Sequence, residues 1–427
     1  MALANDPRHV ASLMLSWNSL ELVSITTLQT LWAGYGKICG LTVRATTAEA
    51  AEHLSQLCGV DTGAVGSTYP LILKLISPPK QKLDHDNPTQ NEGHLRKILS
   101  YEVEQYFYTE VVPLLGDDIA VAKCLSSTRN MKGKEGEAEL EGLTATIMVD
   151  LRPKYPIAGE KRGVLNHTQV HGALEWLASF HRRSWDLNLL QNGLDPYVLP
   201  PIEEYLRRQD PEKTPGSSLW LNGGYTYLAT RRTEFASLQA DNSEWSFAFG
   251  SPLTPDSQAP VADEIASFLT PWGESRLVES YIHGDVKSEN LFTSTEGNKV
   301  AFFDFQYVGL GLGVCDLAKL FTCSVPLELL TDHPEPLPDQ LEMCEPEARL
   351  LKRYQTRLLR GREPAFYEWE TFKFHWETAL ADWCRFQASW GFWGNTEWLE
   401  ARVHSILNDH EWRKRLHHEL KFRDFNK

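Results

Sequence analysis

Three oxygen-bearing side chains lie close together in the middle of this sequence, where short apolar segments end. Asp285 comes shortly after the predicted strand Ser280–Ile282, and Asn290 follows it in the same loop. Asp304 directly follows the apolar run that ends the hairpin predicted over residues 291–303. Because loops at strand ends present polar side chains while packed strands hold them still, we expect the three side chains to meet near one point.

Phosphoryl transfer from ATP requires this set of groups. One carboxylate accepts the proton of the attacking hydroxyl, while a carboxamide and a second carboxylate hold Mg²⁺ against the phosphates. The spacing of Asp285, Asn290 and Asp304 matches the catalytic and metal-binding positions of kinases, which predicts Asp285 as the base and the other two as metal ligands. The alternative is an ordinary turn and strand end, or part of a metallohydrolase site.

A lysine in an apolar strand supplies a candidate phosphate contact. Lys74 lies in the run Tyr69–Ile76, and burying an ammonium group is costly unless it has an anionic partner. The helix predicted over residues 100–115 offers Glu104 as that partner, with Glu102 as the competing choice. The alternative for Lys74 is an edge-strand lysine whose head group reaches solvent.

Two glycines precede this strand in the turn of a predicted hairpin over residues 24–45. Gly34 and Gly36 would let backbone N–H groups approach ATP phosphates, as in the glycine-rich loop of kinases. A lone Gly-x-Gly pair is also typical of a plain hairpin turn, so both interpretations stay open.

The central motif resembles that of the aminoglycoside phosphotransferase and choline kinase superfamily. His283-Gly284-Asp285 stands in place of His-Arg-Asp and Asp304-Phe305-Gln306 in place of Asp-Phe-Gly, while Asp316 in the segment 313–318 is similar to the ecdysteroid kinase-like branch. The resemblance implies a protein-kinase-like fold, ATP and Mg²⁺ as cofactors, and a small hydroxylated acceptor. It also implies that Lys74 with Glu104 grips the phosphates.

Further segments carry the same resemblance. Met148–Leu151 is similar to the segment that joins the two lobes, where the backbone of Val149 would contact the adenine ring. The segment Leu177–His181 is similar to part of the buried helix under the catalytic loop, where His181 is expected to be a hydrogen-bonded core residue. His283 is expected to orient the catalytic loop and Asp316 to brace it.

The sequence departs from this branch at Val286-Lys287, where Leu-Trp is more frequent. A lysine at this position is typical of protein kinases, and Lys287 is expected to neutralise charge on the transferring group. A protein kinase and a catalytically silent pseudokinase or scaffold are therefore the alternatives. No Ala-Pro-Glu segment follows Asp304 to anchor an activation loop, which favours a small acceptor.

The length of 427 residues predicts more than one packed core. We expect an α+β, bilobal, protein-kinase-like fold, with a small β-rich, nucleotide-binding lobe at residues 1–150 and a larger, mainly helical lobe at 151–427 for catalysis and acceptor binding. Within these lobes we expect a strand over residues 119–125 and a loop over residues 241–260. Aromatic residues crowd the helices after residue 368, which predicts lobe core. The alternative is a wall that binds a cationic or flat hydrophobic acceptor beside Glu377 and Asp382.

Composition limits the partners. The formal net charge of −15 disfavours nucleic acid and anionic membranes, and the sequence contains no apolar run long enough to span a bilayer. Seven cysteines without a Cys-x-x-Cys pair predict reduced thiols rather than disulfides or a zinc module. We therefore expect a cytoplasmic enzyme.

Overall fold

The computed structural model describes residues 5–31, 34–60, 63–78, 91–187, 193–255, 257–271 and 277–425. Contacts divide the chain into two compact units, Met1–Pro156 and Ile157–Lys427. The boundary expected after residue 150 falls a few residues before this division. The predicted α+β class is confirmed: the first unit is built on an antiparallel sheet, and the second is mainly helical.

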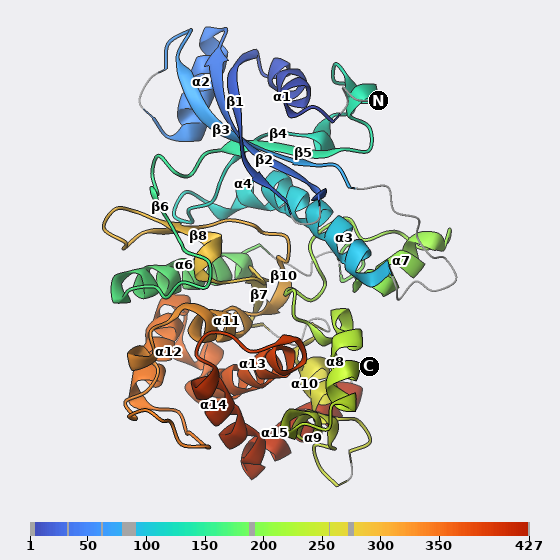
Figure 1. Ribbon diagram of the computed structural model, residues 1–427, viewed down its shortest axis with the longest axis vertical. Coiled ribbons are helices and arrows are strands. Elements are labelled where there is room, and N and C mark those ends of the chain that lie inside the picture. Colours follow the sequence, from blue (N-terminus) through green and yellow to red (C-terminus); the bar gives the residue numbers. More distant parts are fainter. Residues whose placement is uncertain are drawn as a thin grey trace. The chain divides into compact units, whose positions relative to one another are not determined.

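The first unit is organised around a five-stranded antiparallel sheet with the order β1-β2-β3-β5-β4 (Figure 1). Its elements, in chain order, are α1 (Pro7–Ser16), β1 (Leu20–Thr30), β2 (Gly36–Ala45), α2 (Ala48–Cys58), β3 (Thr68–Ile76), α3 (Glu92–Tyr106), a π-helical turn (Phe107–Val111), α4 (Val112–Leu115), β4 (Cys124–Ser127), α5 (Glu137–Leu140) and β5 (Thr144–Val149).

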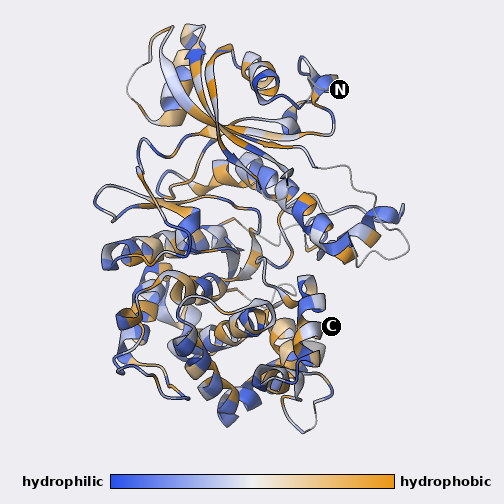
Figure 2. Cartoon of the chain, in the orientation of Figure 1, coloured by the Kyte–Doolittle hydropathy of each residue, from blue (hydrophilic) through white to orange (hydrophobic). Residues whose placement is uncertain are grey.

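Apolar faces of the strands and of α1 and α2 form the core of this unit. Alternate residues of β2 are buried, as expected for a strand with one face on a core. Figure 2 shows the corresponding mixture of apolar and polar residues along the strands. The core includes Val10 and Met14 of α1, Leu54 of α2 and Leu73 of β3, all at 0% exposure. The sheet is therefore a rigid base for Lys74 of β3.

The second unit is mainly helical. Its elements are β6 (Ile157–Ala158), α6 (His167–Trp185), α7 (Pro201–Gln209), α8 (Arg232–Ala240), α9 (Glu244–Gly250), α10 (Val261–Leu269), β7 (Glu279–Ile282), β8 (Leu291–Thr293), β9 (Val300–Phe302), β10 (Gly309–Leu312), α11 (Val314–Ser324), α12 (Glu345–Leu358), α13 (Trp369–Trp390), α14 (Thr396–Asn408) and α15 (His410–Phe425). Figure 2 shows mostly polar residues on α15, at the end of the chain.

Short strands hold the central motif in the second unit. β7 pairs with β10, and β8 pairs with both β6 and β9. Helix α6 contacts β7 and β9, and it begins at the predicted capping box, in which Asn166 and Gln169 bond each other's backbone N–H groups. The loop that carries Asp285 therefore leaves a strand that is packed on a long, well-capped helix.

The aromatic helices of the second unit form core, as predicted. Phe372, Trp376 and Phe386 of α13 and Trp398 of α14 are all at 0% exposure. Trp390, at the end of α13, is 54% exposed, so the aromatic series reaches the surface there.

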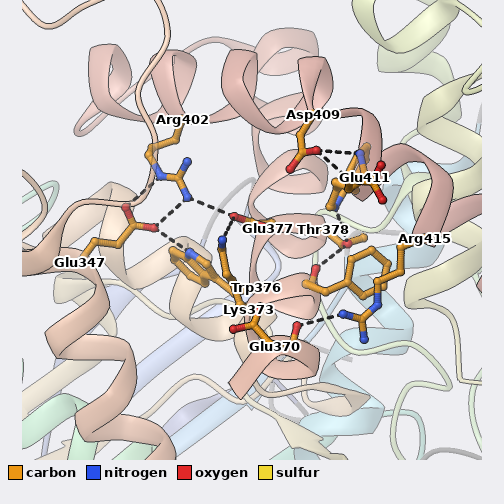
Figure 3. Close-up of polar contacts among 12 residues, drawn as sticks. Glu347, Glu370, Lys373, Trp376, Glu377, Thr378, Arg402, Asp409, Glu411 and Arg415 are labelled. Carbon is orange, nitrogen blue, oxygen red and sulfur yellow. Dashed lines mark hydrogen bonds and ion pairs between the residues drawn. The ribbon is translucent and has the colours of Figure 1, made fainter. Parts of the chain in front are cut away.

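A buried ion pair ties the C-terminal helices together (Figure 3). Glu347 of α12 accepts hydrogen bonds from the guanidinium of Arg402 of α14 at 2.9 Å and from the indole of Trp376 at 2.8 Å. Arg402 also lies 3.6 Å from Glu377 of α13. Arg385 donates to Asp382 at 2.8 Å. Both acidic residues considered for a cationic acceptor therefore have arginine partners, and that interpretation of Glu377 and Asp382 is wrong.

Two other local predictions are corrected. The expected strand over residues 119–125 is reduced to β4, which begins only at Cys124, because the preceding apolar residues Ile119 and Ala122 are buried without strand pairing. The expected loop over 241–260 contains α9, which Ser243 caps by accepting a hydrogen bond from Ser246 N–H. All seven cysteines are free, as predicted. Among the described residues, no helix is long and apolar enough to cross a membrane.

Candidate active site

The loop after β7 brings Asp285 and Asn290 into direct contact. The Asn290 side-chain amide donates to the Asp285 carboxylate at 3.0 Å and to its backbone carbonyl at 2.9 Å. Asn290 ends a short 3-10 turn, Ser288–Asn290, whose entry is fixed because Ser288 N–H donates to the Ser324 hydroxyl at 2.9 Å. The amide therefore sets the direction of the carboxylate, and the Asn290 side-chain oxygen makes no hydrogen bond with any residue that the structure describes.

Lys287 lies beside the same carboxylate. Its ammonium is 3.1 Å from Asp285 and 3.0 Å from Glu289. Burial pulls the pKa of Lys287 down, but the two carboxylates outweigh it and hold the pKa above its usual value. Lys287 therefore remains a fixed positive charge next to Asp285.

His283 orients the loop from within the core. It is fully buried; its Nε2 donates to the Phe303 carbonyl at 3.0 Å, and its Nδ1 accepts from Asp285 N–H at 3.3 Å. Burial lowers the pKa of His283. One neutral tautomer satisfies both bonds, so this imidazole positions the loop, as expected, rather than exchanging protons.

Asp316 braces the start of the loop, which confirms the sequence-based expectation. Its two oxygens accept from His283 N–H at 2.7 Å and Gly284 N–H at 2.9 Å, and His181 lies 3.1 Å away. His181 in turn bonds the Tyr354 hydroxyl at 2.6 Å. Burial raises the pKa of Asp316, but His181 and neighbouring cations outweigh it and lower the pKa overall. This charge is part of the scaffold.

Asp304 is held in an unusual backbone conformation. It directly follows β9 and has a φ of 66°, in the left-handed region that non-glycine residues rarely adopt. Gln306 donates to one oxygen of its carboxylate at 2.6 Å. Phe303 N–H donates to the Asn290 carbonyl at 3.0 Å, so the pairing of β8 with β9 brings Asn290 alongside the segment that carries Asp304.

These oxygens suit a hard divalent cation. Mg²⁺ takes oxygen ligands, usually one or two carboxylates together with phosphate oxygens and water. Asn290 directs its amide nitrogen to Asp285 and keeps its side-chain oxygen for a ligand, while Asp304 contributes a carboxylate. The donor set therefore fits the metal predicted from the sequence.

In the first unit, Lys74 pairs with Glu104. The ammonium lies 2.5 Å from the carboxylate, and the two side chains are 10% and 5% exposed. The structure thus selects Glu104 of the two candidates. Glu104 lies near the end of α3, directly before the π-helical turn, a deviation that is frequent at functional sites.

The remaining candidates of the first unit lie on the same sheet. Gly34 has a φ of 73° in the connection between β1 and β2, and a Cβ added at Gly36 would collide with the Leu75 carbonyl of β3. Val149 ends β5, and its N–H already donates to the Lys123 carbonyl at 2.9 Å. An adenine contact from Val149 would therefore have to use its carbonyl oxygen.

The sequence profile of the ecdysteroid kinase-like family matches residues 81–338, which is 258 of the 427 residues. The chain belongs to this family. It is a phosphotransferase of the small-molecule kinase class, with an alcohol group as acceptor. A comparison with curated proteins gives no match.

Solved structures of several small-molecule kinases are also similar to the chain. They include an ethanolamine kinase from Plasmodium vivax (12% identity, TM-score 0.38, covering 93% of this chain and 84% of that one) and a macrolide 2′-phosphotransferase from Brachybacterium faecium (11%, 0.40, 96% and 96%). A choline kinase from Streptococcus pneumoniae has 11% identity and a TM-score of 0.33, and the match covers 92% of this chain and 94% of that one. Because these TM-scores are low, the kinase assignment rests on the family match.

A pocket of about 290 Å³ opens beside Asp285 in this ecdysteroid kinase-like chain. It is lined by the catalytic loop, by the face of α11 that carries Lys319 and Cys323, and by the aromatic end of α13 with the segment after it. Burial raises the pKa of Cys323 to about 12, so this thiol stays protonated. The volume suits a small molecule or part of a larger one.

Sequence reasoning missed four charged residues that line this pocket: Lys161, Arg162, Glu289 and Lys319. Glu289, which shares Lys287 with Asp285, lies within the catalytic motif and could have been noticed there. Lys319 lies among apolar residues of α11 and is 4% exposed. The signal that identified Lys74, a lysine in an apolar segment, is also present at Lys319.

Proposed function

We propose that this ecdysteroid kinase-like protein transfers the γ-phosphate of ATP to a hydroxyl of a small molecule, with ATP and Mg²⁺ as cofactors. Asp285 acts as the base, and Asn290 and Asp304 hold the metal. Lys74 with Glu104 grips the phosphates, and Lys287 offsets charge on the transferring group. Gly34, Gly36 and Val149 are the proposed further nucleotide contacts.

The observation that carries the proposal is the bond between the Asn290 amide and the Asp285 carboxylate. It directs one carboxylate toward an incoming hydroxyl and leaves the amide oxygen for a cation. The loop is held by buried groups that already bond one another, His283 and Asp316, so its two functional side chains need little reorganisation. Such preorganisation is what phosphoryl transfer requires of the protein.

In the proposed mechanism, Asp285 accepts the proton of the acceptor hydroxyl as that oxygen attacks the γ-phosphorus. The bond from the γ-phosphorus to the oxygen that bridges it to the β-phosphate breaks, and ADP leaves. Lys287, fixed 3.1 Å from Asp285, places positive charge beside the reacting oxygens. When bound, Mg²⁺ would offset negative charge on the phosphates.

A small acceptor is favoured over a protein substrate by the segment between Asp304 and Asp316. This segment contains β10, which pairs with β7, and it enters α11 directly. It therefore packs as part of the sheet, whereas an activation loop would have to extend and seat a peptide.

The test is thermal unfolding of wild type and Asp304→Asn with ATP, with and without Mg²⁺. Asparagine tolerates the left-handed conformation, so the variant removes charge with little backbone strain. Ligand at a hundredfold excess over its dissociation constant should stabilise the wild type by about 2.7 kcal/mol. We expect a Mg²⁺-dependent rise in midpoint for the wild type and its loss in Asp304→Asn.

The matched control is Asp241→Asn, which removes the same charge from an exposed position outside the site. It should keep the full Mg²⁺-dependent rise. No rise for the wild type at millimolar ATP would refute the proposal in favour of a silent scaffold. A screen of hydroxylated small molecules for ADP release would follow a positive result.

A further inference from the structure

The pocket beside Asp285 carries more positive than negative charge. Its lining includes four cationic side chains, of Lys161, Arg162, Lys287 and Lys319, and two carboxylates, of Asp285 and Glu289. The sum is +2, in a protein whose formal net charge is −15. Such a local reversal of sign attracts an anion to this pocket.

Lys319 is the buried member of this set. It is 4% exposed, and within the described part of the chain its ammonium has no hydrogen-bonding or ion-pairing partner. The carboxylate one turn earlier, Asp316, is already bonded by His283 and Gly284 N–H groups. Asp316 supplies negative charge near Lys319, because Lys319 helps to lower its pKa, but no direct bond joins the two side chains. The buried N–H groups of the ammonium can therefore bond an anionic ligand.

Two rings of the aromatic wall, Tyr225 and Trp390, already hold a cation that belongs to the protein. Arg231, 1% exposed, places its guanidinium carbon 4.4 Å from the ring centroid of Tyr225 and 5.1 Å from that of Trp390. Both rings line the pocket, so their attraction for cations is already used by the protein's own arginine. The rings remain available for stacking or apolar contact.

The wall is held in place before any ligand binds. The side-chain amide of Gln387 both donates to the Trp393 carbonyl and accepts from Trp393 N–H, each at 3.1 Å. Asn395 donates to the carbonyls of Phe321 and Val325, both at the C-terminal end of α11, at 2.9 and 2.8 Å. The segment after α13 is thus fixed against the helix that carries Lys319, which lowers the entropic cost of binding a rigid ring.

We propose that this pocket takes a hydroxylated acceptor that carries an aromatic or flat apolar ring and a carboxylate. Its hydroxyl reaches Asp285, its ring contacts Trp390 and Trp393, and its carboxylate pairs with Lys319. This inference rests on the proposed function, because it assigns the substrate class of the same site. It keeps the flat hydrophobic acceptor that the aromatic and acidic residues suggested in the sequence and replaces the cationic one.

The experiment compares three para-substituted benzyl alcohols: 4-(hydroxymethyl)benzoate, its near-isosteric uncharged amide and the cationic 4-(aminomethyl)benzyl alcohol. Affinity is measured by calorimetry and kcat/KM by ADP release with Mg²⁺ and ATP. The wild type should prefer the acid over the amide by about tenfold to a hundredfold, as for a partly buried hydrogen bond between charged groups. The amine should be the poorest.

Variants of Lys319 test whether this side chain causes the preference for the acid over the amide. Lys319→Met should remove the advantage of the acid over the amide, and Lys319→Arg should restore part of it. The matched control is Lys299→Met, which removes one positive charge from an exposed position of the β8–β9 hairpin outside the pocket lining. Its acid-to-amide ratio should equal that of the wild type.

Thermal stabilisation by ATP and Mg²⁺ distinguishes failure of the anionic-acceptor inference from failure of the kinase proposal. If the wild type keeps it but binds none of the probes, binds acid and amide equally, or prefers the amine, the anionic-acceptor inference is wrong and the kinase proposal stands. Loss of the stabilisation in Lys319→Met alone would assign Lys319 to nucleotide phosphate and also overturn the inference. No stabilisation of the wild type refutes both.

Discussion

Two charged clusters of the second unit use the same residue types in opposite ways. Around Glu347 and Arg402, the charges are 0% and 1% exposed and pair with each other, so the cluster holds helices together. Around Asp285 and Lys287, the side chains are 15% and 28% exposed and line a pocket.

The difference lies in what each cluster leaves unsatisfied. Glu347 receives donors on both oxygens, from Arg402 and Trp376, while Asn290 in the other cluster keeps an oxygen free for a ligand. Charge in a protein interior is therefore weak evidence for function by itself. Incomplete pairing at the wall of a pocket is stronger evidence.

The largest effect should come from removing the base. Asp285→Asn keeps the shape of the side chain and its bond with Asn290, yet cannot accept a proton. We expect kcat for an acceptor found by the ADP-release screen to fall by about 10²- to 10⁴-fold, with an unchanged thermal midpoint. A variant that retains wild-type turnover would show that the cluster around Asp285 is structural as well.

Breaking the structural cluster should act on stability. Glu347→Leu leaves the buried guanidinium of Arg402 with only Glu377, 3.6 Å away, as a carboxylate neighbour. The free energy of unfolding should fall by about 3 kcal/mol, the lower end of the range for a broken buried pair. Chemical denaturation of the second unit measures this loss. The double variant Glu347→Leu with Arg402→Met should be more stable than Glu347→Leu alone; a midpoint unchanged in the single variant would contradict the assignment.

The smallest effect concerns pH. Burial lowers the pKa of His283 in the folded protein below its usual value of 6.5. At pH values between this lowered pKa and 6.5, the unfolded chain therefore binds more protons than the folded one. Stability present above pH 6.5 should therefore be lost as pH falls, at up to about 1.4 kcal/mol per pH unit for this one group.

Denaturation between pH 7 and 5 measures that dependence. His283→Gln should flatten the slope, while His418→Gln, at an exposed position of α15, should retain the wild-type slope. An identical slope in all three proteins would mean that other groups account for it.

Much of the geometry of the candidate site could be predicted because its residues lie in short sequence segments next to recognisable strands. Asp285 and Asp304 follow strands, and Asn290 precedes one, and the apolar runs of these strands are visible in the sequence. The capping box marks the start of α6. Glu104 could not be distinguished from Glu102, since only the packed orientation of α3 shows which carboxylate faces Lys74.

Other features depend on partners that are distant in sequence. Glu377 looked like a free acidic group beside aromatic residues, but Arg402, on another helix, lies 3.6 Å from it. Lys319 became a candidate only when the segment after α13 was found to help enclose its pocket. Such contacts cannot be predicted from local sequence patterns, because each residue, considered alone, could equally be exposed to solvent or paired with a different residue.

The left-handed backbone of Asp304 has a consequence for sequence variation. Glycine and asparagine adopt this conformation most readily, and each is reached from an aspartate codon by a single-nucleotide change. Both remove the carboxylate while they preserve the fold. Given the metal-binding role proposed for Asp304, one point mutation would thus yield a folded, inactive variant, whereas most other replacements at this codon would also strain the backbone.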